Sequence, residues 1–460
     1  MAHDYMKHRI LNYICKHKLY YDIFDILYKA GFETHIVGGF LRDLVYVDSI
    51  SEDMDIITNA SPEEKEKIFS MMSVSQVGKL VTLVNGVQIA TYRKDVVNTG
   101  RRTEAISVQV DTVEEDLSRR DFTINAIAFN PITGTFIDLF QGIRDIREQK
   151  INFIGNPKDR IEEDNERILR GCRMVALMGG SFGRDAQIAL RENAHLIEVV
   201  PKERISLEIT KTVKRIKKSS QFFETMKLIG VLKYIFPSLV SCIDQDGGHH
   251  HAETVWQHCM DAGDAISTNH WRTKLAGYLH DVGKPPCAEM DEKYKISFIG
   301  HELSGCDLVK NELYILKFSN VDTKFISGLI LLHMNSFSKK ISDRALRRFL
   351  ARLETHNITY RTWFRLFIAD KHANRASRDF TWVEIKQFLS KIRNLNKVFT
   401  LKLEINGYDV METLSLGQGP VIGKILKECS DHCIDFPEDN NREFLLNFIR
   451  GLYYENGVCQ

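Results

Sequence analysis

The spacing of apolar residues changes from helical to strand-like early in the chain. Over residues 1–34, apolar side chains recur at helical spacing, as at Ile10, Tyr13 and Ile14, and the pattern ends at Gly31. From residue 35 to 150, short segments rich in β-branched residues alternate with turns. These segments are HIVGGFLRD, MDIIT, SVSQVGKLVTLV, VQIATYR, AISVQV and TFIDLF. The pattern predicts a helical extension followed by a mixed sheet.

Beyond residue 162 nearly every segment has the i, i+3, i+4 apolar spacing of helices, as in RILRGCRMVALM, ISLEITKTVKRI and FFETMKLIGVLKYIF. A turn-rich stretch, PSLVSCIDQDGG, suggests a second boundary near residue 240. We therefore expect an α+β domain followed by all-α domains. The expected divisions are a helical extension (1–34), a sheet domain (35–150), a helical neck and body (151–240), a histidine-rich helical domain (241–400) and a helical tail (401–460).

Composition narrows the class of protein. A length of 460 residues suggests roughly three packed domains. Lys and Arg number 62 against 61 Asp and Glu, so any polyanion must be held by local clusters of cations. Nine cysteines without a CxxC pair indicate neither a disulfide framework nor a thiolate zinc site, and Cys429 and Cys433 are expected to be free helical thiols. With no signal-like start and no apolar run near the roughly 20 residues of a membrane span, we expect a cytoplasmic protein with no membrane partner.

Two features in the predicted sheet domain suggest phosphate chemistry. Gly38 and Gly39 separate a predicted strand from a predicted helix, where backbone N–H groups can approach a phosphate, and Arg42 follows one turn later. Asp53 and Asp55 alternate along an extended segment, so both point to one face and can share Mg²⁺ ions that drive nucleotidyl transfer. Each feature alone also fits a plain structural turn or a solvated edge strand.

Together with SRRDFTINAIAFN at 118–130, these features resemble the head of the polymerase β nucleotidyltransferase superfamily, specifically the class II tRNA nucleotidyltransferases. The resemblance implies a polymerase-β-like head in which Asp53 and Asp55 are catalytic and bind Mg²⁺. It implies that the nucleotide's sugar and phosphates are contacted by Arg120, Asp121 and Asn125. It also assigns IDLFQGIRD, with Asp138, Gly142 and Asp145, to a hinge, and KERISLEI, with Arg204 and Glu208, to the last helix motif.

The segment EDNERILRGCR at 163–173 is expected to choose the base. Asp164 and Arg167 are three residues apart, so on one helix they share a face. Cytosine and adenine both present an amine donor beside a ring-nitrogen acceptor, so an accepting aspartate and a donating arginine can pair with them and reject uracil and guanine. Arg170 and Arg173 continue the row and would hold the triphosphate. The plainer alternative is a surface helix with charge pairs, and the polar Asn165 and Glu166 stand where we expect smaller or apolar residues in relatives.

Bacterial poly(A) polymerases resemble the same head. They usually carry a basic GR[RK]F-like segment and a basic tail, whereas this chain has QVGKLVTLV at 76–84 and a tail that is not basic. Both differences favour CCA addition. The pair Arg101 and Arg102 is expected near RNA, and KTVKRIKK (211–218) offers a face for a tRNA acceptor stem or, equally well, a solvated helix face.

Histidines concentrate in the second half of the chain. The pair His280-Asp281 before a Gly-Lys turn resembles the HD metal-dependent phosphohydrolases. By that resemblance a first divalent metal, of unassigned identity, would be held by His258, His280, Asp281 and Asp370, and His301 and His333 would complete a second site. His249, His250 and His251 have no assigned role. The likeness to HD-containing tRNA nucleotidyltransferases extends to INGYDVMETLSLGQGPVIGKIL near the C-terminus.

The sequence thus predicts a template-independent enzyme that adds or repairs the 3′-terminal CCA of tRNA from CTP and ATP, with an additional phosphohydrolase activity of the HD domain. One alternative is a bacterial-type poly(A) polymerase, and another is an HD phosphohydrolase whose head only binds RNA. A nucleotide-alarmone synthetase and hydrolase also joins such domains, but there the HD half normally comes first.

Overall fold

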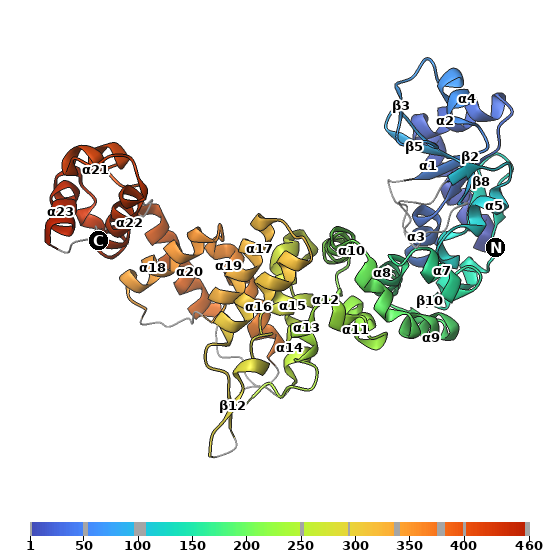
Figure 1. Ribbon diagram of the computed structural model, residues 1–460. Helices are drawn as coiled ribbons and strands as arrows, with labels where there is room; N and C mark the ends of the chain where they lie inside the picture. The colour runs from blue at the N-terminus through green and yellow to red at the C-terminus, as the bar shows by residue number, and fades with distance from the viewer. Residues whose placement is uncertain are drawn as a thin grey trace. The chain divides into compact units, whose positions relative to one another are not determined.

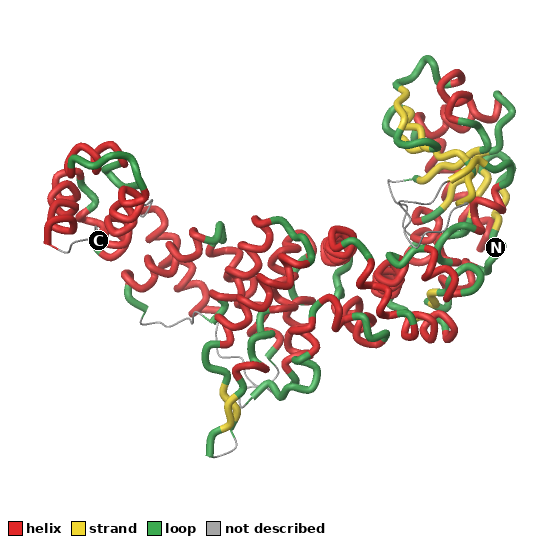
Figure 2. Tube along the Cα trace, viewed as in Figure 1, coloured by secondary structure: helices red, strands yellow, loops and turns green. Residues whose placement is uncertain are grey.

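The computed structural model describes residues 2–48, 54–95, 107–248, 253–292, 295–334, 341–374, 382–398 and 402–455 (Figure 1). Contacts divide the chain into two compact units. The first comprises Met1–Val240 with Glu312–Phe318, and the second comprises Ser241–Asn311 with Ser319–Gln460. Most strands gather in the N-terminal part, and helices make up most of the rest (Figure 2). The α+β prediction followed by all-α segments is confirmed.

Two helices precede the sheet, as predicted. They are α1 (Ala2–Lys16) and α2 (Lys18–Lys29), and they meet at His17. Arg9 of α1 donates to Asp48 at 2.9 Å, the residue that caps the C-terminus of α3 (Gly39–Val47) with a φ of 52°. The extension therefore packs against the end of the helix that follows the glycine turn.

A seven-stranded mixed sheet forms the centre of the head, in the order β3-β4-β5-β2-β1-β8-β9. The strands are β1 (Thr34–Val37), β2 (Asp55–Thr58), β3 (Val74–Gln76), β4 (Val81–Val84), β5 (Val87–Thr91), β8 (Ala128–Asn130) and β9 (Thr135–Ile137). β2 and β5 are parallel, and the other neighbours are antiparallel. β6 (Arg93–Asp95) and β7 (Ser107–Gln109) form a separate pair.

The register of the two central strands places the glycine turn beside an acidic residue. Val37 pairs with Asp55, so the end of β1 and the start of β2 lie at one edge of the sheet. The chain then turns through Gly38 into α3. This edge therefore brings together a helix N-terminus, which favours anions, and a carboxylate.

Helices lie between the strands of the first unit and continue after the sheet. They are α4 (Pro62–Ile68), α5 (Val113–Ser118), the 3₁₀ turns η2 (Thr123–Asn125) and η3 (Ala194–Val199), α6 (Gly142–Arg147), α7 (Pro157–Glu163), α8 (Arg167–Met178), α9 (Arg184–Glu192), α10 (Lys202–Arg215), α11 (Ser220–Leu228), α12 (Leu232–Ile235) and α13 (Pro237–Val240). A short parallel pair, β10 (Lys150–Ile151) and β11 (Ser181–Phe182), accompanies them. α8 packs against both α10 and α11.

The second unit is helical, as expected. Its helices are α14 (Val255–Asp264), α15 (Trp271–Leu279), α16 (His301–Ile315), α17 (Asn320–Leu332), α18 (Asp343–Thr355), α19 (Tyr360–Ala373), α20 (Trp382–Val398), α21 (Gly407–Leu414), α22 (Pro420–Asp435) and α23 (Arg442–Glu455). The last residues of α16, from Glu312 on, are counted with the first unit. The short 3₁₀ turns η4 (Thr268–His270), η5 (Pro285–Cys287) and η6 (Pro437–Asp439) and the hairpin β12 (Glu289–Met290) and β13 (Ile296–Ser297) join them. α14 and α15 pack on each other and on α19.

The two cysteines of α22 behave as apolar residues. Cys429 and Cys433 are free and buried in a small core with Val410, Ile425 and Leu445. Burial raises the pKa of the Cys429 thiol to about 12, so it stays protonated at neutral pH. None of the helices that the structure describes has both the length and the apolar character that a bilayer span requires.

Lys65 of α4 carries a buried charge, which gives a first prediction. Its side chain is fully buried, and its Nζ donates to the Ile89 carbonyl at 2.9 Å. Burial lowers the pKa of this ammonium from 10.5 to about 8. Lys65→Met should therefore raise the free energy of unfolding by about 1–3 kcal/mol at pH 7, because methionine fills similar space without a charge.

Because the folded-state pKa is depressed, the cost of burying the charge is fully present below pH 8 and fades as pH rises towards 10.5. Urea denaturation should thus show the difference between wild type and Lys65→Met shrinking over that range. Lys67→Met, at an exposed position of the same helix, serves as the control. A lower free energy of unfolding for Lys65→Met at pH 7 would contradict this account.

Candidate active site and metal centre

The glycine turn lies close to Asp55 at the edge of the sheet. Gly38 has a φ of 77°, a conformation that other residues rarely adopt, and a Cβ there would lie 3.0 Å from Asp55 Oδ2. Asp55 is exposed at the start of β2 and faces the same space as the N-terminus of α3. Asp53 lies outside the described residues, so its place on the same face as Asp55 stays a prediction.

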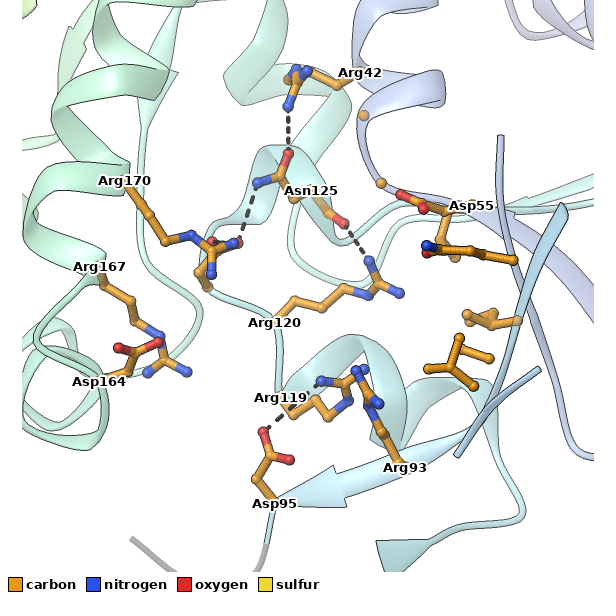
Figure 3. Close-up of a pocket in the computed structure, with 18 of the residues that line it drawn as sticks. Arg42, Asp55, Arg93, Asp95, Arg119, Arg120, Asn125, Asp164, Arg167 and Arg170 are labelled. Carbon is orange, nitrogen blue, oxygen red and sulfur yellow. Dashed lines mark hydrogen bonds and ion pairs between the residues drawn. The ribbon is translucent and has the colours of Figure 1, made fainter. Parts of the chain in front are cut away.

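A pocket of ≈ 370 Å³ opens at this edge (Figure 3). It collects all of the residues from the described part of the head and neck that the sequence predicted to bind nucleotide or metal. They are Gly38, Gly39, Arg42, Asp55, Arg120, Asp121, Asn125, Asp164, Arg167, Arg170 and Arg173. Segments up to 135 residues apart in sequence thus meet around one cavity.

The pocket is strongly cationic. Seven arginines line it, against four aspartates. Arg93, Arg119 and Asp95 belong to this lining and were not predicted from the sequence. An excess of guanidinium groups around a concave site favours a multiply charged anion such as a triphosphate.

The buried carboxylate of Asp116 holds two of these arginines. Its oxygens accept from Arg119 Nη2 at 2.9 Å and Arg120 Nη2 at 3.0 Å, and Oδ1 also accepts from the Arg93 backbone N–H. Burial alone would raise the pKa of Asp116, but Arg120 and Arg119 outweigh it and hold that pKa below its usual value. Asp116 was missed from the sequence, although its i, i+3 and i, i+4 spacing to the two arginines was a usable signal.

A second network holds Arg42 and Arg170. Arg42 donates to Asp43 at 2.7 Å and to Asn125 Oδ1 at 2.9 Å. Asn125 in turn donates to Asp121, which pairs with Arg170 at 2.5 Å. Burial would raise the pKa of Asp121, but Arg170 outweighs it and lowers that pKa to about 2. Asp121 therefore orients its neighbours as an ionised group.

Asp164 does not share a helix with Arg167, which corrects the expectation from spacing. α7 ends at Glu163, Asp164 is extended with φ −150° and ψ 98°, and α8 begins at Arg167. The cause is local, because Asp164 Oδ1 accepts the Glu166 backbone N–H and so favours a turn over a continuous helix. The two residues still lie side by side, since Arg167 N donates to the Asp164 carbonyl at 3.1 Å (Figure 3).

One oxygen of Asp164 is an unsatisfied acceptor at the pocket. Its side chain is buried, and Oδ2 has no hydrogen-bond partner. A buried acceptor without a donor costs about 1–3 kcal/mol, a penalty that a ligand N–H group would remove. Beside it, Arg167 donates from Nη1 to Glu163 at 2.7 Å and to the Arg160 carbonyl at 2.6 Å.

The two remaining sequence motifs, KERISLEI and IDLFQGIRD, make contacts that connect elements around this pocket. Arg173 pairs with Glu208 at 2.6 Å, which links α8 to α10, and Arg204 pairs with Glu166 at 3.4 Å. In the other motif, Asp138 accepts backbone N–H groups of Gly142 and Ile143 at the start of α6.

Contact with Thr123 ties α6 to the turn that carries Asn125. A Cβ at Gly142 would lie 2.2 Å from the Thr123 carbonyl oxygen, and Asp145 accepts from the Thr123 hydroxyl at 2.5 Å. No described contact shows a hinge movement, so the hinge role stays a prediction. Arg101 and Arg102 lie outside the described residues.

In the second unit, two groups of ligand atoms lie close enough to hold metal ions. One group is His258, His280 and Asp370, and the other is Asp281, His301 and His333. Asp281 also joins the first group, because its Oδ2 lies 3.4 Å from His280 Nε2 and 3.7 Å from His258 Nε2, while its Oδ1 lies 3.4 Å from both His301 and His333. His249, His250 and His251 lie outside the described residues.

The four imidazoles are oriented for metal binding by acceptors behind them. The Nδ1 atoms of His280, His301 and His333 lie 2.6–2.9 Å from backbone carbonyls, and His258 Nδ1 lies 3.2 Å from Glu253. Since these oxygens accept, Nδ1 keeps its proton in either charge state, and the neutral imidazole that binds a metal would present the Nε2 lone pair to the centre of the cluster.

The polar atoms at that centre fit a cation. His280 Nε2 is buried without a hydrogen-bond partner, and the Nε2 atoms of His301 and His333 face each other at 3.3 Å. Burial would raise the pKa of Asp281, but His280 and Lys284 hold it well below its usual range, so the carboxylate is ionised. Lys284, which donates to Asp281 at 2.7 Å, was not singled out from the sequence.

Comparison with protein families identifies three segments. Residues 34–152 match the poly A polymerase head domain, residues 182–243 match the probable RNA and SrmB-binding site of polymerase A, and residues 248–371 match the HD domain. Both the head and the HD family depend on divalent metals.

Curated relatives include both kinds of enzyme that the sequence suggested. A poly(A) polymerase I of Haemophilus influenzae is 31% identical over 47% of this chain and 51% of its own length. A CCA-adding enzyme of Bacillus cereus is 37% identical over 41% of this chain and 48% of its own length. The chain thus spans about half the length of these relatives. A CCA-adding enzyme of Streptococcus mutans is 26% identical over 92% of this chain and 94% of its own length.

Solved structures share the fold along nearly the whole chain. The CCA-adding enzyme of Bacillus stearothermophilus in complex with CTP has a TM-score of 0.61 at 20% identity, over 95% of this chain and 97% of its own. The Thermotoga maritima CCA-adding enzyme complexed with tRNA has a TM-score of 0.53 at 17% identity, over 95% and 96%.

The geometry of the second unit predicts tight metal binding that depends on its histidines. Protein stripped with a chelator and then loaded with Zn²⁺, an ion that suits imidazole ligands, should retain metal after gel filtration. Its melting temperature should rise, since ligand at 100 times Kd adds about 2.7 kcal/mol. His280→Ala should lose most of the retained metal, as measured by elemental analysis.

His195→Ala, at an exposed position of the first unit, is the matched control and should retain metal like wild type. Equal metal content in His280→Ala and wild type would show that this cluster is not the binding site.

Proposed function

We propose that this chain is a class II tRNA nucleotidyltransferase with a C-terminal HD domain, and that it adds or repairs the 3′-terminal CCA of tRNA from CTP and ATP. The observation that carries the proposal is the composition of the head pocket. The pocket combines a glycine turn at a helix N-terminus, several arginines that form ion pairs with carboxylates, Asp55, and the Asp164 oxygen that lacks a hydrogen-bond partner. Solved CCA-adding enzymes with CTP, with ATP and with tRNA support the choice of partners.

Different residues of the pocket would bind the charged triphosphate and the base. Arg42, Arg120, Arg170 and Arg173 would bind the triphosphate and sugar, with Gly38 and Gly39 admitting a phosphate to the backbone. Asp55, with Asp53, would hold Mg²⁺, which when bound supplies charge for the attack of the RNA 3′ hydroxyl on the α-phosphate. These carboxylates would hold the ion near the reacting oxygen, and the arginines would stabilise the negative charge that develops on the phosphate oxygens.

Asp164 and Arg167 would read the base by mimicking a pairing partner. The Asp164 oxygen accepts from the exocyclic amine that cytosine and adenine share, and Arg167 donates to the neighbouring ring nitrogen. Uracil and guanine would leave buried acceptors facing each other, a mismatch that can reject a substrate by 10⁴–10⁵-fold in sites of this kind, as a rough upper bound. Water is displaced from this end because both side chains are buried.

The HD cluster would add a metal-dependent phosphohydrolase activity, with His258, His280, Asp281, His301, His333 and Asp370 as ligands. Lys284 lies next to Asp281 and would keep that carboxylate ionised and oriented. The neck region that matches an RNA-binding family, together with Lys211–Lys218 as a basic face, would hold the acceptor stem. A cytoplasmic location belongs to the same proposal, because tRNA and both nucleotides are found there.

Sequencing of reaction products tests this function. The protein should be given tRNAs that end before the first C, after C and after CC, with CTP and ATP singly and together. With both nucleotides present, wild type should stop at CCA on all three tRNAs, whereas Asp55→Asn should lose at least about 10²-fold in rate because one metal-binding carboxylate is gone. Zn²⁺ retention by the HD cluster should be unchanged in this variant. Long A tails would instead identify a poly(A) polymerase, and no addition would leave only the phosphohydrolase alternative.

The choice of base gives a separate prediction. Asp164→Ala removes the acceptor, so kcat/KM for CTP should fall by about 10²-fold while that for UTP changes little. Asp159→Ala, at an exposed position of α7, is the control and should keep the CTP preference. If Asp164→Ala keeps the full CTP preference of wild type, Asp164 does not read the base.

A further inference from the structure

Arg160 lies behind the pocket and contacts both of its ends. It belongs to α7, and its side chain is only 14% exposed. It is not among the residues that line the cavity. Its guanidinium makes three charged hydrogen bonds, two to the backbone of lining residues Arg119 and Arg120 and one to Glu163, which pairs with Arg167.

Two of these bonds hold the backbone that carries the phosphate-side arginines. Arg160 Nη2 donates to the carbonyl oxygens of Arg119 at 2.6 Å and Arg120 at 2.5 Å. Asp116 fixes the side chains of the same two arginines from the other direction. The backbone position therefore depends on Arg160 and the side-chain direction on Asp116.

The third bond reaches the base side. Arg160 Nη1 donates to Glu163 Oε2 at 2.5 Å, and the same oxygen accepts from Arg167 Nη1 at 2.7 Å. Arg167 Nη1 also donates to the Arg160 backbone carbonyl at 2.6 Å. A single carboxylate thus serves two guanidinium groups, so Arg160 limits how strongly Glu163 can attract Arg167.

We propose that Arg160 is a positioning residue that couples triphosphate binding to base selection, an inference that rests on the proposed nucleotidyl transfer. Without it, Glu163 pairs with Arg167 alone and draws that guanidinium away from the base. At the same time the 119–120 backbone loses both hydrogen bonds from Arg160 Nη2 and shifts relative to the phosphates. Both ends of the pocket therefore change together, although Arg160 contacts no substrate.

Lysine cannot replace this arginine. A lysine ammonium is a compact point charge, whereas the planar fork of arginine reaches two carbonyls from one nitrogen and a carboxylate from another. Arg160→Lys keeps the charge and most of the side-chain volume, so it isolates the loss of the fork. Arg160→Gln removes the charge as well.

The test measures discrimination, which a purely structural role would not change. Single-nucleotide addition to a tRNA lacking CCA should be followed with CTP and with UTP. For Arg160→Lys, kcat/KM for CTP should fall at least about tenfold, and the ratio of CTP to UTP should fall by a similar factor. Arg160→Gln should show the larger change in both quantities.

Arg191→Lys is the matched control. Arg191 also donates to a backbone carbonyl of a neighbouring helix, that of Leu228 at 2.9 Å, but does not line the pocket. Its CTP to UTP ratio should equal that of wild type, and melting temperatures should show whether each variant is folded.

The ratio of CTP to UTP binding affinities in the presence of Mg²⁺ and without RNA separates two kinds of failure. Absence of CCA addition by wild type would overturn the proposed function. A folded Arg160→Lys that keeps the wild-type affinity ratio would overturn the role of Arg160, whatever the catalytic result.

Discussion

The pairing of Asp116 with Arg119 and Arg120 is the interaction on which the head pocket depends. Seven arginines around one cavity would repel each other. Buried carboxylates form ion pairs with several of them, which offsets this repulsion and fixes the positions of the guanidinium groups. Asp116 pairs with the two arginines of the loop after α5. In the same way Asp121 pairs with Arg170, and Glu208 pairs with Arg173. Asp116 and Glu208 do not line the cavity, whereas the arginines that they pair with do, so positive charge remains on its surface. Folding has therefore already oriented the donors that a triphosphate needs, and little reorganisation remains for the bound state.

The same reasoning explains why the two sites differ in chemistry. In the head, acids such as Asp116 and Asp121 are paired with guanidinium groups, whereas the buried Asp164 Oδ2 has no hydrogen-bond partner, so a ligand that offers an N–H group there would be favoured. In the HD cluster, backbone carbonyls fix the tautomers of three histidines and Asp281 presents its two oxygens to two ligand groups. The head pocket is lined mainly by arginines, which suit an anion, whereas the HD cluster gathers imidazole and carboxylate ligand atoms, which suit cations.

Local patterns predicted the mixed sheet and the glycine turn, and the family resemblance added pocket residues such as Arg120, Asp121 and Asn125. Asp164 shows where spacing fails, because one side-chain bond to the Glu166 backbone ends α7 and replaces the expected continuous helix with a turn. Arg160 shows a second limit: its partners are backbone carbonyls 40 and 41 residues away, and no spacing rule reports such a contact. The i, i+4 spacing of Asp116 and Arg120 could have predicted their ion pair. Many charged residues in the chain have such spacing, however, and only the burial of Asp116 marks this pair as important.

The central claim is that protein side chains, and no template, choose the base. Isothermal titration of wild type with each of the four nucleoside triphosphates, in Mg²⁺ and without RNA, measures this before any bond is made. The account predicts that CTP and ATP compete for one site and that UTP and GTP bind at least about tenfold more weakly, because Asp164 would face another acceptor. Equal affinities for all four nucleotides would contradict it.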